Sequence, residues 1–538
     1  MTGDRFDLPA GLVPWNFAEW KNQSFRLDHL NDLPRNSWRT YRLLSMFIKR
    51  SEGLMKISEL FKLEVGQREL DFVDIDPDRD LRVFLDPHFL ALRTDRFSIE
   101  ATSTIRSFFV RLLDAIRADD DVAALELLQY LHEPNETCLG LSQGAPDGRG
   151  LGAIDATKIL SSLKGSRAVK SGLVEHIEDV RIFVHGVDKD KISDMVTNII
   201  RGQLIKYTKS QCDLWGIPIT TGVDSGFYWD RARSQWVSSH EDMLVVDDRR
   251  ILLVPKGVVS YSTRYSSSRF HRHAVLPFLQ HKHLRLNTAL VNRKVSKNGK
   301  ERVWVNKSDV AKEVSSNKDD LGDFTERHKD VFRKFKTSES KLGAKSLDDD
   351  AFNPPTTVEE TADALRDALK AVKKGTSEAD RFHKLVVAIL DFLFYPDLIA
   401  PTAEVKINGG RKRIDIVFEN AASSGFFNRL HQVSDIASTY IIIECKNYSK
   451  DPANPELDQL EGRFSVNRGK FGMLVFRDAK DEALIIERCR DSWRDRQNLI
   501  LPITDACLDR MLLRKIEYPG RSAYEDELRK LAECVRLG

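Results

Sequence analysis

Two short apolar segments in the last third of the sequence carry charged residues, and these charges constrain the fold more than any other feature. The first segment, residues 413–418, holds Asp415 between isoleucines, and the second, residues 440–446, ends in Glu444-Cys445-Lys446. Both have the apolar composition of buried strands. An unpaired charge in such a strand is costly to bury, so we expect the three charges to lie together, with a divalent metal ion between the two carboxylates.

Length and composition predict a multidomain globular chain. At 538 residues it is too long for one hydrophobic core, so we expect two or three domains. The 83 Lys and Arg nearly balance the 81 Asp and Glu, so any surface for nucleic acid has to be local. The six cysteines are scattered, and neither an apolar leader nor a long apolar run is present. These features predict a reduced, cytoplasmic protein without membrane association.

Composition divides the chain into three parts. Residues 1–288 predict an N-terminal sensor or regulatory region of mixed α/β structure, with room for two subdomains. Residues 289–356 are rich in Lys, Asp, Ser and Asn, which is typical of a charged, solvated linker. Residues 357–538 contain the two charged strands. In the N-terminal region periodicity predicts helices at residues 37–49, 105–131 and 195–207. It also predicts a strand at 81–85 and a hairpin at 243–254 that turns at Asp247-Asp248.

The C-terminal part predicts helices on the faces of a central mixed sheet, an α/β architecture. An amphipathic helix is expected at 356–374, and a buried helix at 381–394, which is apolar all round. Phe426-Phe427 in a later loop are expected to plug the core. The other predicted elements are a hairpin with arms 404–407 and 412–418, strands 440–446, 471–476 and 499–503, and helices from 454 and over 505–513.

This order of elements and charges resembles the PD-(D/E)XK nuclease superfamily, in particular its Mrr-like restriction-endonuclease branch. The resemblance covers about residues 375–515 and rests on Asp415, on Glu444-x-Lys446 and on Gln459 in the following helix. It implies a restriction-endonuclease-like mixed sheet. Two positions depart from the pattern: Ile414 replaces the proline of the signature, and His383 occupies the acidic position of the preceding helix, for which Glu378 is the alternative.

The resemblance implies hydrolysis of phosphodiesters with Mg²⁺, for which Mn²⁺ can substitute. Asp415 and Glu444 would be the carboxylate ligands, and the backbone carbonyl of Cys445 a third oxygen ligand. Lys446 would orient or deprotonate the attacking water, and Gln459 would position the water or a phosphate. Arg463, one turn further on, could hold a neighbouring phosphate.

We therefore expect a Mg²⁺-dependent endodeoxyribonuclease, with DNA as partner and defence of a bacterium against foreign DNA as its role. Three alternatives stay open. The charges could form an inert ion pair inside the sheet, with His383 a satisfied core histidine and Gln459 and Arg463 on a solvated helix face. The nuclease-like domain could bind nucleic acid or support assembly without cutting. The substrate could also be RNA. A homo-oligomer and a partner protein are both compatible with the sequence.

Overall fold

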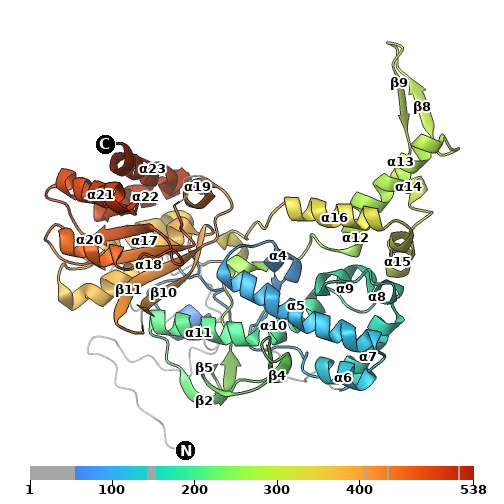
Figure 1. Cartoon of the computed structure of the whole chain (residues 1–538), viewed down its shortest axis with the longest axis horizontal. Helices are drawn as coiled ribbons and strands as arrows, with labels where there is room; N and C mark the ends of the chain where they lie inside the picture. The colour runs from blue at the N-terminus through green and yellow to red at the C-terminus, as the bar shows by residue number, and fades with distance from the viewer. Residues whose placement is uncertain (1–54, 142–152, 408, 433–435, 519–521) are drawn as a thin grey trace, which may run out of the picture. The chain divides into compact units, whose positions relative to one another are not determined.

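Helices dominate the N-terminal half of the chain, and a five-stranded sheet forms the centre of the C-terminal part (Figure 1). The computed structural model describes residues 55–141, 153–407, 409–432, 436–518 and 522–538. The expected mixed α/β class is confirmed. The helix predicted at 37–49 lies outside the described residues.

Two of the predicted N-terminal helices are each divided in two. Residues 105–131 contain a break at Asp119, whose φ of 54° is left-handed, and Asp120 then caps the next helix by accepting a hydrogen bond from the Ala123 N–H at 3.0 Å. Residues 195–207 are divided at Ile200. The helices of this half are α3 (Ile57–Leu60), α4 (Pro87–Ala91), α5 (Arg96–Arg117), α6 (Asp121–Leu128), α7 (Ala153–Gly165), α8 (Arg167–Lys170), α9 (Ile177–Phe183), α10 (Lys189–Ile199), α11 (Arg201–Trp215), α12 (Ser267–Phe270) and α13 (Leu276–Leu286).

The N-terminal strands are short and antiparallel. The hairpin predicted at 243–254 is confirmed, because Val246 pairs with Arg249 and both turn aspartates have positive φ. The strand predicted at 81–85 is reduced to two residues, which pair with β7. The strands are β1 (Phe84–Leu85), β2 (Thr220–Asp224), β3 (Tyr228–Asp230), β4 (Gln235–Val237), β5 (His240–Val246), β6 (Arg249–Ile251) and β7 (Val259–Ser260).

Residues 289–356, expected to be a solvated linker, contain ordered elements that pack onto the core. Phe324, Phe332, Phe335 and Phe352 are all buried. These aromatics lie among many charged residues, so the overall composition of the segment does not reveal the apolar stripes of its helices. The elements are a hairpin of β8 (Asn292–Val295) and β9 (Glu301–Trp304), followed by α14 (Lys307–Val310), α15 (Lys318–Arg327) and α16 (Lys329–Lys341).

The C-terminal sheet has the strand order β10-β11-β12-β13-β14. The first three strands are antiparallel neighbours, and β12, β13 and β14 pair in parallel. The β10–β11 turn contains Gly409 and Gly410, with φ of 67° and 83°, as a tight turn requires. The strands are β10 (Leu398–Ile407), β11 (Lys412–Asn420), β12 (Tyr440–Lys446), β13 (Phe471–Phe476) and β14 (Leu499–Thr504).

Two helices beside this sheet were not anticipated, α21 (Glu482–Arg496) and, at the end of the chain, α23 (Ser522–Leu537). Because β13 and β14 are parallel, their connection has to cross over, and α21 makes this crossover. Few of its residues are buried, among them Ile485 and Cys489, so its sequence has little apolar periodicity. The Phe426-Phe427 plug is buried as expected, but within a helix. The other helices are α17 (Val358–Ala371), α18 (Ala379–Phe394), α19 (Gly425–Gln432), α20 (Asn454–Glu461) and α22 (Asp505–Glu517).

The two halves of the described chain are joined by hydrogen bonds. Residues 55–538 form one unit. Glu419 at the end of β11 accepts hydrogen bonds from the N–H groups of Arg96 and Phe97 at the start of α5, at 2.8 and 3.4 Å. No helix among the described residues combines the length and the apolar character needed to cross a bilayer.

Candidate active site

Asp415 and Glu444 lie beside each other at one end of the β11–β12 pair. Ile416 pairs with Ile443, so continuing this antiparallel register by one residue places Asp415 opposite Glu444. Directly opposite residues of an antiparallel pair share a face of the sheet. Asp415 Oδ2 accepts a hydrogen bond from the N–H of Cys445 at 3.0 Å, in the position where the next ladder bond would form. The side chain of Asp415 therefore takes the place of backbone pairing and fixes its own carboxylate next to Glu444.

Lys446 and Gln459 complete a connected group around Glu444. The Lys446 ammonium donates hydrogen bonds to Glu444 Oε1 at 2.7 Å and to Gln459 Oε1 at 3.3 Å. Gln459 Nε2 in turn donates to the same Glu444 oxygen. Period two of the strand places Glu444 and Lys446 on one face, and helix α20, which crosses over from β12 to β13, brings Gln459 to them. All four predicted catalytic residues are therefore in one place.

The second oxygen of Glu444 distinguishes this group from a simple buried ion pair. The Glu444 side chain is fully buried, yet its Oε2 atom has no hydrogen-bond partner within the described residues. Burial and the neighbouring Asp415 carboxylate raise the pKa of Glu444, and Lys446 offsets only part of this effect. A buried carboxylate oxygen without a partner is unfavourable, so Glu444 Oε2 is the unsatisfied atom of this group.

Cys445 offers its backbone to this site, and its thiol lies among the core residues. The side chain is buried, and burial raises the pKa of the thiol well above its usual range. In an extended strand the N–H and C=O of one residue point to the same side. Since the Cys445 N–H points to Asp415 on β11, the Cys445 carbonyl oxygen also points to the β11 side of the strand.

Arg463 lies just beyond the end of α20, close enough for its charge to lower the pKa of Glu444. Its Nε atom is buried and without a hydrogen-bond partner in the described part of the chain. This arrangement places the Arg463 guanidinium near the Glu444 carboxylate.

Glu378 and His383, the two candidates for an additional metal ligand, are not brought into the group. Glu378 Oε2 accepts a hydrogen bond from the Lys373 N–H at 2.8 Å, so this carboxylate caps a turn before α18. Across the described residues, no three His, Cys, Asp or Glu side chains form a group that could hold a metal ion. The side-chain donors at the site are therefore limited to Asp415 and Glu444.

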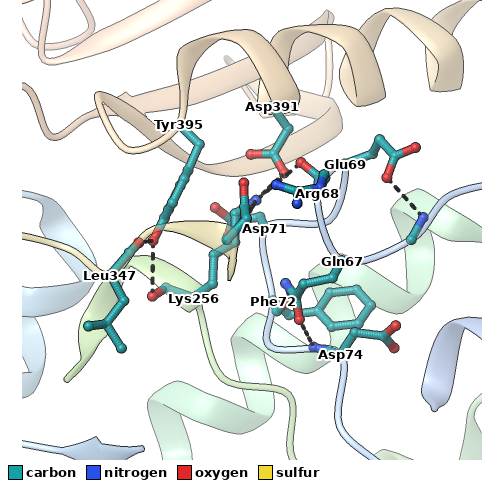
Figure 2. A network of polar contacts seen from close by, with 12 residues as sticks. Gln67, Arg68, Glu69, Asp71, Phe72, Asp74, Lys256, Leu347, Asp391 and Tyr395 are labelled. Carbon is teal, nitrogen blue, oxygen red and sulfur yellow. Dashed lines mark hydrogen bonds and ion pairs between the residues drawn. The ribbon is translucent and has the colours of Figure 1, made fainter. Parts of the chain in front are cut away.

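A second buried polar cluster was missed by the sequence analysis. Lys256 is fully buried and lies 3.3 Å from the carboxylate of Asp391 (Figure 2). It also lies 3.1 Å from the carboxylate of Asp349. The carboxylate of Asp71 also lies close enough to Lys256 for its charge to raise the pKa of Lys256. Although burial lowers the pKa of Lys256, these carboxylates raise it by more, so the ammonium stays protonated. A signal was present in the sequence: Asp391 is the one charged residue between 385 and 394.

This cluster connects the N-terminal half with the helix and strand that precede the site. Asp71 accepts hydrogen bonds from the Tyr207 hydroxyl at 2.5 Å and from the Ala400 N–H of β10 at 2.9 Å. Tyr395, which follows α18, donates a hydrogen bond to the carbonyl of Leu347 at 2.7 Å (Figure 2). Because the cluster is closed to solvent, we assign it a structural role: it holds α18 and β10 against the N-terminal half.

Comparisons with known proteins bear on the N-terminal half alone. Residues 62–266 match a family described as a domain of unknown function (DUF8370). Neither the curated proteins nor the solved structures contain a match to this chain. The matched segment includes Asp71 and Lys256 of the buried cluster and ends well before Asp415.

Proposed function

We propose that this chain is a metal-dependent endonuclease that hydrolyses the phosphodiesters of DNA. The observation that carries the proposal is the hydrogen bond from the Cys445 N–H to Asp415, since together with the Lys446–Glu444 hydrogen bond it holds two carboxylates and a lysine ammonium at one end of the β11–β12 pair. Further support comes from the order of elements around them. A buried helix, three antiparallel strands, a crossover helix and a parallel strand follow one another in the arrangement that the resemblance to PD-(D/E)XK nucleases implies.

The available donors fit one divalent cation with a preference for oxygen. Carboxylate oxygens of Asp415 and Glu444 and the carbonyl of Cys445 are the ligand types that Mg²⁺ and Mn²⁺ accept, and the unpartnered Glu444 Oε2 is the atom a cation would satisfy. Such an ion stabilises negative charge on a phosphate and lowers the pKa of a bound water. With two carboxylates and no third acidic group in reach among the described residues, we propose a one-metal site.

Three side chains of the protein would orient the water and bind the phosphate. Lys446, 15% exposed and held by Glu444 and Gln459, is positioned to orient a water molecule and to offset charge that develops on the phosphate. Gln459 fixes the orientation of both Glu444 and Lys446. Arg463, with its buried unpartnered Nε, is positioned for a phosphate oxygen.

We further propose that the N-terminal half recognises a signal and controls the nuclease, in defence against foreign DNA. Support for control comes from the buried cluster around Lys256, which connects that half to α18 and β10. The defence role rests on the resemblance to Mrr-like proteins.

The test is cleavage of supercoiled plasmid by the full chain with Mg²⁺ or Mn²⁺. We expect the wild type to cut, EDTA to abolish cutting, and Lys446→Ala to reduce the rate by about 10²–10⁴-fold, the usual contribution of a positioned acid–base group. Lys530→Ala is the matched control, because this lysine is exposed on α23 and should cut like the wild type. Single-stranded and duplex RNA of the same sequence are tested in parallel.

Two results would contradict the proposal. If wild type and Lys446→Ala cut at the same rate, the observed activity does not come from this site. If neither cuts any substrate, while both bind duplex DNA with the same affinity, the nucleic-acid-binding alternative replaces the nuclease.

A further inference from the structure

The β8–β9 hairpin has a higher net positive charge than the whole chain. Its residues 292–304 contain one acid, Glu301, and the five cations Arg293, Lys294, Lys297, Lys300 and Arg302, a formal net charge of +4, whereas the whole chain of 538 residues has +2. Residues 293–303 are all exposed. Figure 1 shows the two strands extending beyond the end of α13, and the hairpin was part of the segment expected to be a linker.

One face of this two-stranded ribbon is cationic and aromatic. Lys294 pairs directly with Arg302, and Asn292 pairs with Trp304, so these four side chains share a face. Like charges at directly opposite positions destabilise a sheet. The Arg302 guanidinium lies 5.6 Å from the centre of the Trp304 ring, which holds it in place. A ribbon that keeps two opposed cations is stabilised when a polyanion lies against that face.

The acid of the hairpin does not neutralise this face. Glu301 lies on the opposite face, where it forms an ion pair with Arg293 at 3.2 Å. Arg293 also donates a hydrogen bond to Asn287 Oδ1 at 2.6 Å. Lys294, Arg302 and the two lysines of the tip, Lys297 and Lys300, have no ion-pair partner among the residues that the structure describes.

The ribbon is held in a defined conformation. At the tip, Ser296 N–H donates to the Lys300 carbonyl at 2.9 Å, and Gly299 supplies the left-handed position with φ of 75°. At the base, the side chain of Gln280 on α13 donates to the carbonyl of Val305, and Val305 itself is buried. The cations are therefore presented on a framework that is formed before any ligand binds, which lowers the entropic cost of binding.

From these observations we propose that the β8–β9 hairpin is a duplex-DNA-binding arm whose Lys294–Arg302 face lies in the major groove. The major groove of B-form DNA is wide enough for a two-stranded ribbon. The major groove of A-form RNA is too deep and narrow for side chains to read, so the arm discriminates in favour of DNA. Its role in presenting substrate rests on the proposed nuclease function, whereas its binding of DNA is separately measurable.

The experiment measures binding of a fluorescent DNA duplex of about 30 base pairs, some three turns of B-form helix, to the full chain by anisotropy in EDTA, where no cutting occurs. Lys294→Gln/Arg302→Gln is compared with Lys312→Gln/Lys334→Gln, which removes two equally exposed lysines from the neighbouring α14–α16 segment (each 81% exposed). We expect the arm variant to bind at least about tenfold more weakly, and the slope of log Kd against log salt to fall by about 1 for each phosphate that the variant no longer neutralises. The control variant should bind like the wild type.

Several outcomes overturn the arm and leave the nuclease untouched. These are equal affinity of both variants for the duplex, an equal loss for duplex RNA of the same sequence, and arm-dependent binding to phosphatidylserine vesicles in place of DNA. The reverse case is also distinguishable. If arm-dependent binding of DNA is found while the wild type fails to cut with Mg²⁺ or Mn²⁺, the arm stands and the nuclease proposal fails.

Discussion

Lys256 is the buried charge on which the contact between the two halves of the chain depends. Its ammonium is surrounded by Asp71, Asp349 and Asp391 and has no exposure to solvent. We predict that Lys256→Met lowers the free energy of unfolding by about 3–5 kcal/mol, because removal of one partner leaves buried carboxylates without a counter-charge. Urea denaturation followed by circular dichroism at about pH 9, above the raised pKa of Asp391, measures the change.

Two further variants test whether the change in stability comes from the buried charge. Lys530→Met, at an exposed position, should change the free energy of unfolding by less than about 0.5 kcal/mol. Lys256→Met/Asp391→Leu removes both partners and should recover part of the stability. If Lys256→Met alone is as stable as the wild type, the cluster does not hold the halves together in the way we infer.

Strand β13 lies against β12, which carries Glu444 and Lys446, so its packing controls the position of the site. A Cβ atom at Gly472 would lie 2.9 Å from the carbonyl oxygen of Ile442 and 2.9 Å from the ring of Phe464. We predict that Gly472→Ala destabilises the protein by about 1–3 kcal/mol, as overpacked core substitutions do. Because β12 has to shift, the rate of plasmid cutting should also fall.

The matched control for this variant is Gly165→Ala, since a Cβ at Gly165 meets no atom within 4 Å. It should leave both the thermal midpoint and the cutting rate close to those of the wild type. A Gly472→Ala protein with unchanged stability would mean that β12 and β13 are further apart than the structure has them.

Buried carboxyl groups along the contact between the halves should make the stability of the whole protein depend on pH. Burial raises the pKa of Asp391 to about 8 and that of Glu419 to about 7. A carboxyl group whose pKa is raised by folding stabilises the native state fully below its unfolded pKa, and this contribution is lost as the pH rises through the folded value. We therefore predict that the free energy of unfolding falls between about pH 5.5 and about pH 8.5.

The variant Asp391→Asn isolates one of these groups. It cannot ionise, so its stability should fall less steeply with pH, and relative to the wild type it should gain on the order of 3 kcal/mol between about pH 5.5 and about pH 8.5. Urea titrations at several pH values across this range measure both slopes. Parallel slopes for the two proteins would show that Asp391 does not titrate in this range.

Much of the C-terminal block could be predicted from local pattern. Strands β12 and β13 have the predicted bounds, and the β10–β11 turn follows from its two glycines. The juxtaposition of Asp415 with Glu444 was also inferred, because charges in apolar strands require partners. Helix α21 was not predicted, because few of its residues are buried. The break at Asp119 was not predicted either, because a left-handed residue does not change the spacing of apolar residues around it.

By itself the sequence determined which short segments are strands and helices, and which charges had to find a partner, because these properties depend on neighbours within a few residues. The tertiary structure alone decided three further features. It gave the Glu378 carboxylate a partner in the Lys373 N–H, it brought Lys256 to Asp391 across 135 residues, and it formed a cationic hairpin in a segment that was expected to be a linker. Each of these depends on contacts between residues far apart in the chain, which no local pattern records.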